Sequence, residues 1–367
     1  MMTANDAQHT NPMTSGEDGK TLSALADLSA KNGLPAPDEA YFTAGDGARI
    51  RYAHWRTSNE RRQGSVLYLN GRTEFIEKTL DIYGILCRNG LDVWTMDWRG
   101  QGLSTRALAD REKGHIADYQ YYLDDLHHFI SDVTDLPAPS DGRGKTILLG
   151  HSMGGHLGFR YLHDHPGLFD AAVFSAPMID ISVNKAPLRW LNAAIVGLGF
   201  GEGYALGTSG FRPIYSNPDD PADNGSIDDY RRLIGRFEDL SSDAEKRMEI
   251  ERLLRENPAL ALGGPTAGWL DATFRSINLT WTTGYAEAIE TPVLIVGGGR
   301  DRVVITARQE MMAKRLPNGR FHMIDKAAHE ILVECDDVRF DFLERIAAFA
   351  DIRLEQPAID MSGCIGR

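Results

Sequence analysis

The chain contains, in this order, a serine, an aspartate and a histidine that each follow an apolar segment of strand-like length. Ser152 lies in the string Gly150-His151-Ser152-Met153-Gly154, after the apolar segment 146–149 and before a segment with helical periodicity. A strand that turns into a helix within about four residues leaves little room for side chains, which explains the flanking glycines. We therefore expect a strained backbone at Ser152, with its hydroxyl raised above the sheet at the positive end of a helix, where it could act as a nucleophile.

Asp301 and His329 complete the order expected for nucleophilic catalysis on such a turn, in which the serine precedes the acid and the acid precedes the base. Asp301 follows the apolar segment 292–296 in a glycine-rich loop, and His329 follows the last strand-like segment, 320–324. Asp180, which comes after the preceding strand, is the alternative acid. A loop carboxylate is usually a solvated turn residue and a lone histidine is usually structural, so the assignment depends on this order.

These three residues could cleave an ester. His329 would remove the proton from the Ser152 hydroxyl as it attacks a carbonyl, and would pass that proton to the leaving alcohol. Asp301 would hold the imidazole in the required tautomer. The oxyanion that forms needs two N–H donors, for which we expect the backbone N–H groups of Met153 and Arg72. The Arg72 side chain would then be available for a phosphate or a headgroup.

Alternating strands and helices are expected to position these residues. Strands are predicted at 65–69, 92–96, 146–149, 171–175, 292–296 and 320–324, a hairpin over 41–55, and helices at 76–88, at 118–132, after Ser152 and at 338–350. This alternation builds a mostly parallel central sheet with helices on both faces, which places the chain in the α/β fold class.

The alternation stops between residues 181 and 290, where the pattern is helical with loops. We expect a helical cap there, inserted between two parts of an α/β core at 35–180 and 291–352. Ser226 with Asp229 and Ser242 with Glu245 have capping-box spacing. Glycines at 197, 199, 201 and 203 do not match a dinucleotide-binding loop and indicate a bend between cap helices. The polar composition of residues 1–34 predicts a disordered tail with one short helix at 22–30. Residues 353–367 are expected to form a C-terminal tail.

The composition and net charge of the chain argue against several kinds of binding partner. A net charge of −13 argues against nucleic acid and against electrostatic docking on anionic membranes, which leaves at most transient contact with a membrane surface. Three scattered cysteines, a polar N-terminus and no apolar segment of membrane-spanning length predict a cytoplasmic protein without a disulfide framework. The histidines show no metal-ligand spacing, so we expect neither a metal nor a cofactor.

Six strings occur in order along the chain: YLNGRTEF, DWRGQGLS, GHSMGG, APM, GRDRVV and HEILVE. Together, over residues 41–350, they resemble the α/β-hydrolase family of lysophospholipase L2 and the monoacylglycerol lipases. The resemblance implies the α/β-hydrolase fold, a triad of Ser152, Asp301 and His329, and a cap over an acyl pocket. Many monoacylglycerol lipases have His-Gly where this chain has Asn70-Gly71, a difference that bears on the choice of substrate.

We expect hydrolysis of a monoacyl lipid ester, such as a lysophospholipid or a monoacylglycerol, because the cap supplies apolar and aromatic surface for an acyl chain. Most of these aromatic side chains are expected in the core of the cap: Trp190, Phe200, Tyr204, Phe211, Trp269 and Phe274. A short-chain carboxylesterase and an acyltransferase that uses the same triad are the alternatives, and a non-catalytic ligand-binding protein is a more distant one.

Overall fold

The computed structural model describes residues 17–137, 142, 144–183, 185–210 and 240–355. One central sheet of eight strands has the order β1-β2-β4-β3-β5-β6-β7-β8. β1 and β2 form an antiparallel hairpin, β2 pairs antiparallel with β4, and every other neighbouring pair is parallel. The strands are β1 (Asp38–Thr43), β2 (Arg49–Trp55), β3 (Gly64–Leu69), β4 (Leu91–Met96), β5 (Lys145–His151), β6 (Ala171–Ser175), β7 (Val293–Gly298) and β8 (Gly319–Ile324).

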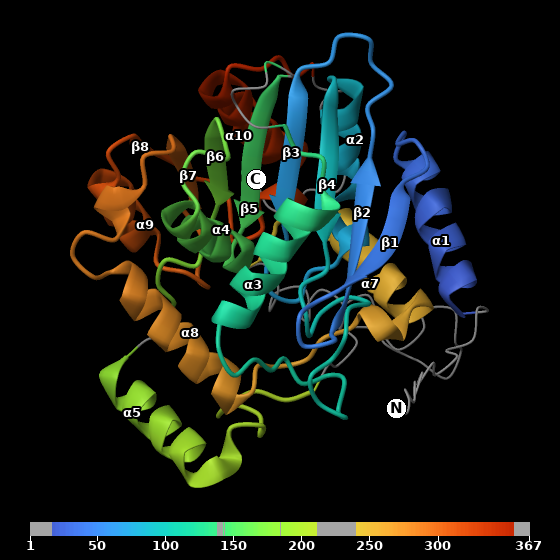
Figure 1. The fold of residues 1–367 in the computed structure, drawn as a ribbon. Coiled ribbons are helices and arrows are strands. Elements are labelled where there is room, and N and C mark those ends of the chain that lie inside the picture. The colour runs from blue at the N-terminus through green and yellow to red at the C-terminus, as the bar shows by residue number, and fades with distance from the viewer. Residues whose placement is uncertain (1–16, 138–141, 143, 184, 211–239, 356–367) are drawn as a thin grey trace, which may run out of the picture.

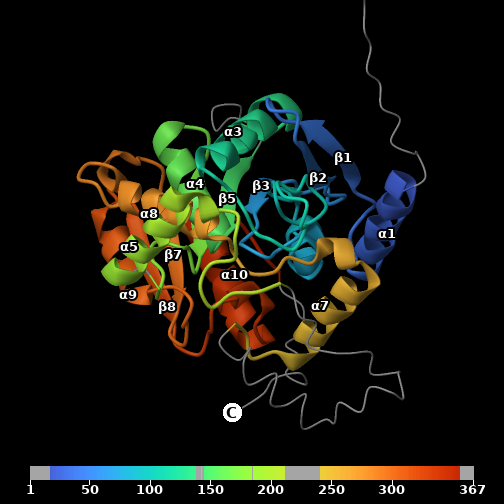
Figure 2. The same ribbon diagram turned by 90° about the horizontal axis from the view of Figure 1, so that it is seen from below.

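Helices cover both faces of this sheet, as the alternating pattern predicts (Figure 1). Seen from below in Figure 2, α3 and α4 lie on one side of the strands and α10 lies on the other. α9 packs against β7 and β8 near one edge. The helices of the core are α2 (Leu80–Arg88), which follows the 3₁₀ turn η1 (Ile76–Thr79), α3 (Gln120–His128), which continues into the π-helix η2 (Phe129–Val133), α4 (Met153–Asp164), α9 (Thr306–Arg315) and α10 (Asp336–Ala350).

β3 and β4 are buried along their whole length, and β5 along all but its first residue, because parallel strands are covered on both faces. Their apolar residues therefore form nearly continuous runs. α4 lies close to the sheet: a Cβ added at Gly158 would come within 2.8 Å of the Phe174 ring. This close approach fixes the start of α4 at the end of β5, and Ser152 lies at that junction.

The N-terminal segment differs from its prediction. A disordered tail with a short helix was expected over residues 1–34, but α1 spans Glu17–Lys31 and packs against α2. Leu25 and Ser29 are fully buried, and the Ser29 hydroxyl accepts a hydrogen bond of 3.1 Å from the Trp55 indole. The helix predicted at 22–30 is therefore present but longer than expected, and its packing against the core is not evident from local composition.

The segment between β6 and β7 is helical where it is described. It contains α5 (Ala186–Ile195), the π-helix η4 (Val196–Phe200), α7 (Ala244–Glu256), the 3₁₀ turns η5 (Pro258–Leu260) and η6 (Ala286–Ala288), and α8 (Ala267–Thr280). In Figure 1, α5 lies outside the layers of the core, with α8 beside it. The predicted capping box at Ser226 lies outside the described residues. The one at Ser242 is misplaced by one residue, because the Asp243 side chain caps α7 by accepting from the Lys246 N–H at 3.0 Å.

Two further observations bear on the expected environment. None of the helices in the described ranges is long and apolar enough to cross a bilayer. Cys335, directly before α10, is disulfide-bonded, so the prediction of a chain without disulfides is wrong at this residue. Disulfides are rare in reducing compartments, and the cysteine argument for a cytoplasmic location therefore falls away. The location stays a prediction from the N-terminal composition.

Candidate active site

Ser152 lies at a sharp turn between β5 and α4 and has a backbone φ of 48° and ψ of −113°. This conformation is strained for any residue other than glycine. The neighbouring glycines make the turn possible: a Cβ added at Gly154 would lie 2.2 Å from the Leu69 carbonyl oxygen, and one at Gly150 would lie 2.9 Å from the Gly155 nitrogen. The turn therefore presents the Ser152 hydroxyl at the N-terminus of α4, as the sequence predicts.

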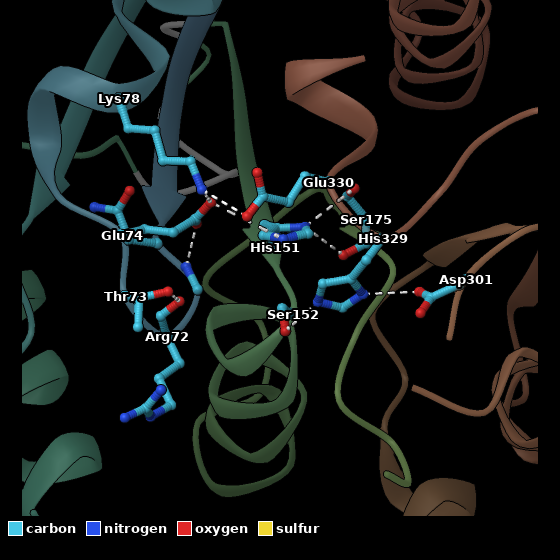
Figure 3. Close-up of polar contacts among 12 residues, drawn as sticks. Arg72, Thr73, Glu74, Lys78, His151, Ser152, Ser175, Asp301, His329 and Glu330 are labelled. Atoms are coloured by element: carbon cyan, nitrogen blue, oxygen red, sulfur yellow. Dashed lines mark hydrogen bonds and ion pairs between the residues drawn. The ribbon is translucent and has the colours of Figure 1, made fainter. Parts of the chain in front are cut away.

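The three residues that the sequence analysis singles out lie together (Figure 3). His329 Nε2 is 2.9 Å from Ser152 Oγ, and His329 Nδ1 is 2.7 Å from Asp301 Oδ2. Asp301 comes from the loop after β7 and His329 from the loop after β8, so the ends of neighbouring parallel strands bring them to one edge of the sheet. All three side chains are almost completely buried.

The chemistry of the partners fixes the tautomer of His329. An ionised carboxylate can only accept a hydrogen bond, so His329 Nδ1–H donates to Asp301. Nε2 is then free to accept the proton of the Ser152 hydroxyl. This is the arrangement that a general base needs before it removes a proton from a nucleophile.

The alternative acid, Asp180, does not reach the histidine. Its Oδ2 accepts from Arg308 Nε at 3.1 Å, and its Oδ1 accepts from the Ile181 N–H. Asp301 and not Asp180 is therefore the carboxylate beside His329.

Arg72, one of the two expected oxyanion donors, lies on the side of Ser152 away from Asp301. Met153 is the first residue of α4, and Arg72 lies in the loop 70–74 after β3, opposite His329 in Figure 3. We call residues 70–74 the β3 loop. The Arg72 side chain turns away from Ser152 in this view, and its Nη2 donates to the Gly263 carbonyl oxygen at 2.7 Å. Its guanidinium also lies over the Trp269 ring, 5.1 Å from the centroid, and burial lowers its pKa to about 10.

This contact changes the interpretation of Arg72. From the sequence, this side chain is expected to be available for a headgroup. In the structure it binds the segment before α8 instead. Arg106 acts on the same segment, since its Nη2 donates to the carbonyl oxygens of Ala259 and Ala261 at 3.0 and 3.2 Å. Two arginines of the core thus bind main-chain carbonyls of the cap.

The β3 loop is held in place by side chains that the sequence analysis does not assign. The Gln101 amide accepts from the Thr73 N–H at 2.7 Å and donates to the Gly71 carbonyl oxygen at 3.2 Å. Glu74 Oε2 accepts from the Gly71 N–H at 2.5 Å. Both residues lie inside strings that carry the family resemblance, DWRGQGLS and YLNGRTEF. Membership of these strings was the sequence signal that could have pointed to them.

The aromatic side chains of the cap are less often buried than expected. Trp269 and Phe274 are buried, but Trp190 is 77% exposed and Phe200 is 66% exposed. Tyr204 is half-buried, and Phe211 lies outside the described residues. The prediction that most of these rings lie in a cap core is therefore wrong for Trp190 on α5 and Phe200 on η4, which are exposed.

Comparisons with known proteins identify the family of the chain. The profile of the Hydrolase_4 family, described as "Serine aminopeptidase, S33", matches residues 60–336. Lysophospholipase L2 from Escherichia coli K12 is 30% identical over 322 residues, covering 85% of this chain and 87% of its own. Probable lysophospholipase L2 from Haemophilus influenzae is 27% identical over 315 residues, covering 85% of this chain and 92% of its own.

A solved structure shows the same fold. A soluble variant of the monoglyceride lipase from Saccharomyces cerevisiae, in complex with a substrate analogue, superposes with a TM-score of 0.66. The alignment covers 86% of this chain and 95% of the other, at 18% sequence identity. At that identity the likeness establishes the α/β-hydrolase fold and no finer property.

Proposed function

Because the chain belongs to the Hydrolase_4 family of α/β-hydrolases, we propose that it is a serine hydrolase that cleaves the carboxylic ester of a monoacyl lipid. In this proposal residues 35–180 and 291–352 form the catalytic core and residues 181–290 form the cap. The observation that carries it is the pair of contacts at His329, 2.9 Å to Ser152 Oγ and 2.7 Å to Asp301 Oδ2.

The reaction would run through an acyl-enzyme. Ser152 Oγ attacks the ester carbonyl while His329 Nε2 takes its proton, and Asp301 stabilises the imidazolium that results. The backbone N–H groups of Met153 and Arg72 would bind the oxyanion of the tetrahedral intermediate. His329 then gives the proton to the leaving alcohol, and a water molecule, activated by the same histidine, releases the fatty acid and restores Ser152.

The names of the relatives support a lipid ester as the substrate. They include lysophospholipase L2 and a monoacylglycerol lipase from Mycolicibacterium smegmatis, the latter 24% identical over 287 residues. Among monoacyl lipids we favour a lysophospholipid or a monoacylglycerol.

We further propose that the cap makes transient contact with a lipid surface. Large apolar side chains are exposed on and around α5 and η4, and this apolar patch consists of Trp190, Leu191, Leu198, Phe200 and Leu206. Lys185 and Arg189 accompany it, and Glu202 is the one acidic residue from 185 to 206. An apolar face with few charges fits the interface of a bilayer or micelle, where the substrate would reside.

A substrate panel tests the proposed function. Lysophospholipids, monoacylglycerols and short-chain esters are compared for the wild type, for Ser152→Ala and for Ser131→Ala, which removes an exposed hydroxyl in η2. We expect release of fatty acid from monoacyl lipids, abolished only in Ser152→Ala.

Labelling of Ser152 by a fluorophosphonate distinguishes an enzyme from a binding protein, and product analysis with added glycerol distinguishes hydrolysis from acyl transfer. Turnover that survives in Ser152→Ala would refute the proposal.

A further inference from the structure

The Lys78 ammonium lies between two carboxylates that come from different parts of the chain (Figure 3). Its Nζ is 2.9 Å from Glu74 Oε1 and 2.9 Å from Glu330 Oε1. The three side chains are only 5%, 3% and 11% exposed, respectively. One buried cation thus joins two anions that the chemistry of Ser152, Asp301 and His329 does not use.

Each carboxylate belongs to a loop that carries part of the candidate site. Glu74 accepts the Gly71 N–H and so fixes the β3 loop directly before Arg72, the expected oxyanion donor. Glu330 follows His329 in the chain, and its own N–H donates to the Leu240 carbonyl oxygen at 2.7 Å. We call residues 325–330 the histidine loop. Lys78, four residues after Glu74, links the two loops through its ion pairs.

His151 occupies the space between these loops. Its ring centroid is 5.0 Å from that of His329, and its Nε2 is 4.0 Å from Glu74 Oε1. A Cβ added at Gly71 would lie 3.0 Å from the His151 ring, so the β3 loop packs directly against it. Since His151 precedes Ser152, a shift of either loop would be transmitted to the nucleophile.

From this arrangement we propose that Lys78 is a positioning residue that fixes the β3 loop and the histidine loop relative to each other and to Ser152. The inference rests on the proposed function, which requires both loops to hold their groups in the correct relative position. The expected oxyanion donor and the base act on the same carbonyl group, and a misplacement of about 1 Å in such a site can cost roughly a hundredfold in rate.

The charges of the group are consistent with this role. Burial by itself would raise the pKa of the Glu330 carboxyl, but Lys78 and Arg247 outweigh burial and lower the pKa to about 2. Lys78 likewise lowers the pKa of Glu74 against the effect of burial. Both carboxylates are therefore ionised at neutral pH, and removal of Lys78 would leave two buried anions that repel each other or take up a proton. Either response moves at least one loop.

Lys78→Met is the primary test. We expect kcat on the best ester of the panel to fall about 10- to 100-fold, with KM within about threefold of the wild type, because the lost geometry matters in the transition state. Phosphonylation of Ser152 by a fluorophosphonate should slow in parallel. Lys246→Met is the matched control, since Lys246 also pairs with a carboxylate, Asp81, away from Ser152, and kcat should be unchanged there.

Two further variants separate positioning from stability. Glu330→Gln preserves the shape of one link and removes its charge, and should lower kcat about three- to tenfold in a fully folded protein. The triple variant Lys78→Met, Glu74→Gln, Glu330→Gln removes all three charges of the group together. We expect it to regain the melting temperature that Lys78→Met loses while kcat stays low.

The outcomes are distinguishable. Recovery of kcat together with stability in the triple variant, or a wild-type kcat in folded Lys78→Met or Glu330→Gln, would overturn the inference. These measurements run beside Ser152→Ala. If turnover persists in that variant, the proposed function fails, whereas Ser152-dependent turnover that is insensitive to Lys78 defeats only the positioning role.

Discussion

Asp301 binds His329 with one carboxylate oxygen and its own loop with the other. Oδ2 lies 2.7 Å from His329 Nδ1, while Oδ1 accepts the backbone N–H groups of Val303 and Val304 at 2.8 and 3.0 Å. The carboxylate can therefore neither rotate nor withdraw without breaking backbone hydrogen bonds. Its orientation, and through it that of the imidazole, is set by the turn after β7.

Asp301→Asn should inactivate the protein without unfolding it. An amide can donate to Nδ1 and so favours the wrong tautomer of His329, which leaves Nε2 unable to accept the Ser152 proton. We expect kcat to fall by about 10³- to 10⁴-fold. Asp180→Asn is the matched control, because that aspartate also follows a strand but pairs with Arg308. Ester hydrolysis by the purified variants measures both effects, and equal losses in the two variants would contradict the assignment.

Gly154→Ala should damage the site through the β3 loop. A Cβ at this position would lie 2.2 Å from the Leu69 carbonyl oxygen and 2.5 Å from that of Asn70, so the loop that carries Arg72 must move. We expect kcat to fall at least tenfold and the protein to lose about 1–3 kcal/mol of stability from overpacking. Gly45→Ala, with no atom near the added Cβ, is the control. Chemical denaturation and ester kinetics measure the two quantities, and wild-type kcat in Gly154→Ala would exclude this route.

The locations of the central strands and the places of the three site residues after strands could be predicted because their signals are local. The central strands are apolar runs, and each of Ser152, Asp301 and His329 comes soon after a predicted strand. The carboxyl ends of neighbouring parallel strands meet at one edge of a sheet, so order along the chain was enough to bring these side chains together.

Other features depend on contacts between distant segments and have no local signal. Lys78 and Glu330 are 252 residues apart, and nothing in either string shows that they pair. The helix at 22–30 has a local signal, but the burial of Leu25 against the core has none. Trp190 and Phe200 are residue types that usually lie in a core. They are exposed here because α5 lies outside the layers of the core, beside α8.

The apolar patch should determine binding to lipid surfaces. Replacing Trp190, Leu198 and Phe200 together with serine removes three large exposed apolar groups, each of which contributes about 1.5–3 kcal/mol when fully buried. We expect sedimentation with vesicles of zwitterionic lipid to fall at least about tenfold, while hydrolysis of a soluble short-chain ester is unchanged. Leu279→Ser, at a partly exposed site on α8, serves as the control. Unaltered vesicle binding in the triple variant would show that another surface contacts lipid.

Stability should fall as the pH drops below neutrality, because two buried histidines are held neutral. Burial and the nearby Arg160 charge lower the pKa of His156 from 6.5 to about 3, and burial together with Arg56 lowers that of His54 to about 4. Below pH 6.5 the unfolded chain takes up these protons and the folded chain does not. The stabilisation is therefore complete above pH 6.5 and is lost as the pH falls toward the folded pKa values, by up to about 1.4 kcal/mol per pH unit for each group.

Urea denaturation between pH 5 and pH 7 measures this slope, and His156→Gln tests its origin. The glutamine amide can still bond to the Ser276 hydroxyl, which lies 2.6 Å from His156 Nε2, and it does not titrate. We expect the variant to be less stable than the wild type at pH 7 but to lose less stability between pH 7 and pH 5, since one proton-binding difference has been removed. An identical slope in the two proteins would mean that His156 is not held neutral by its burial among α4 and α8.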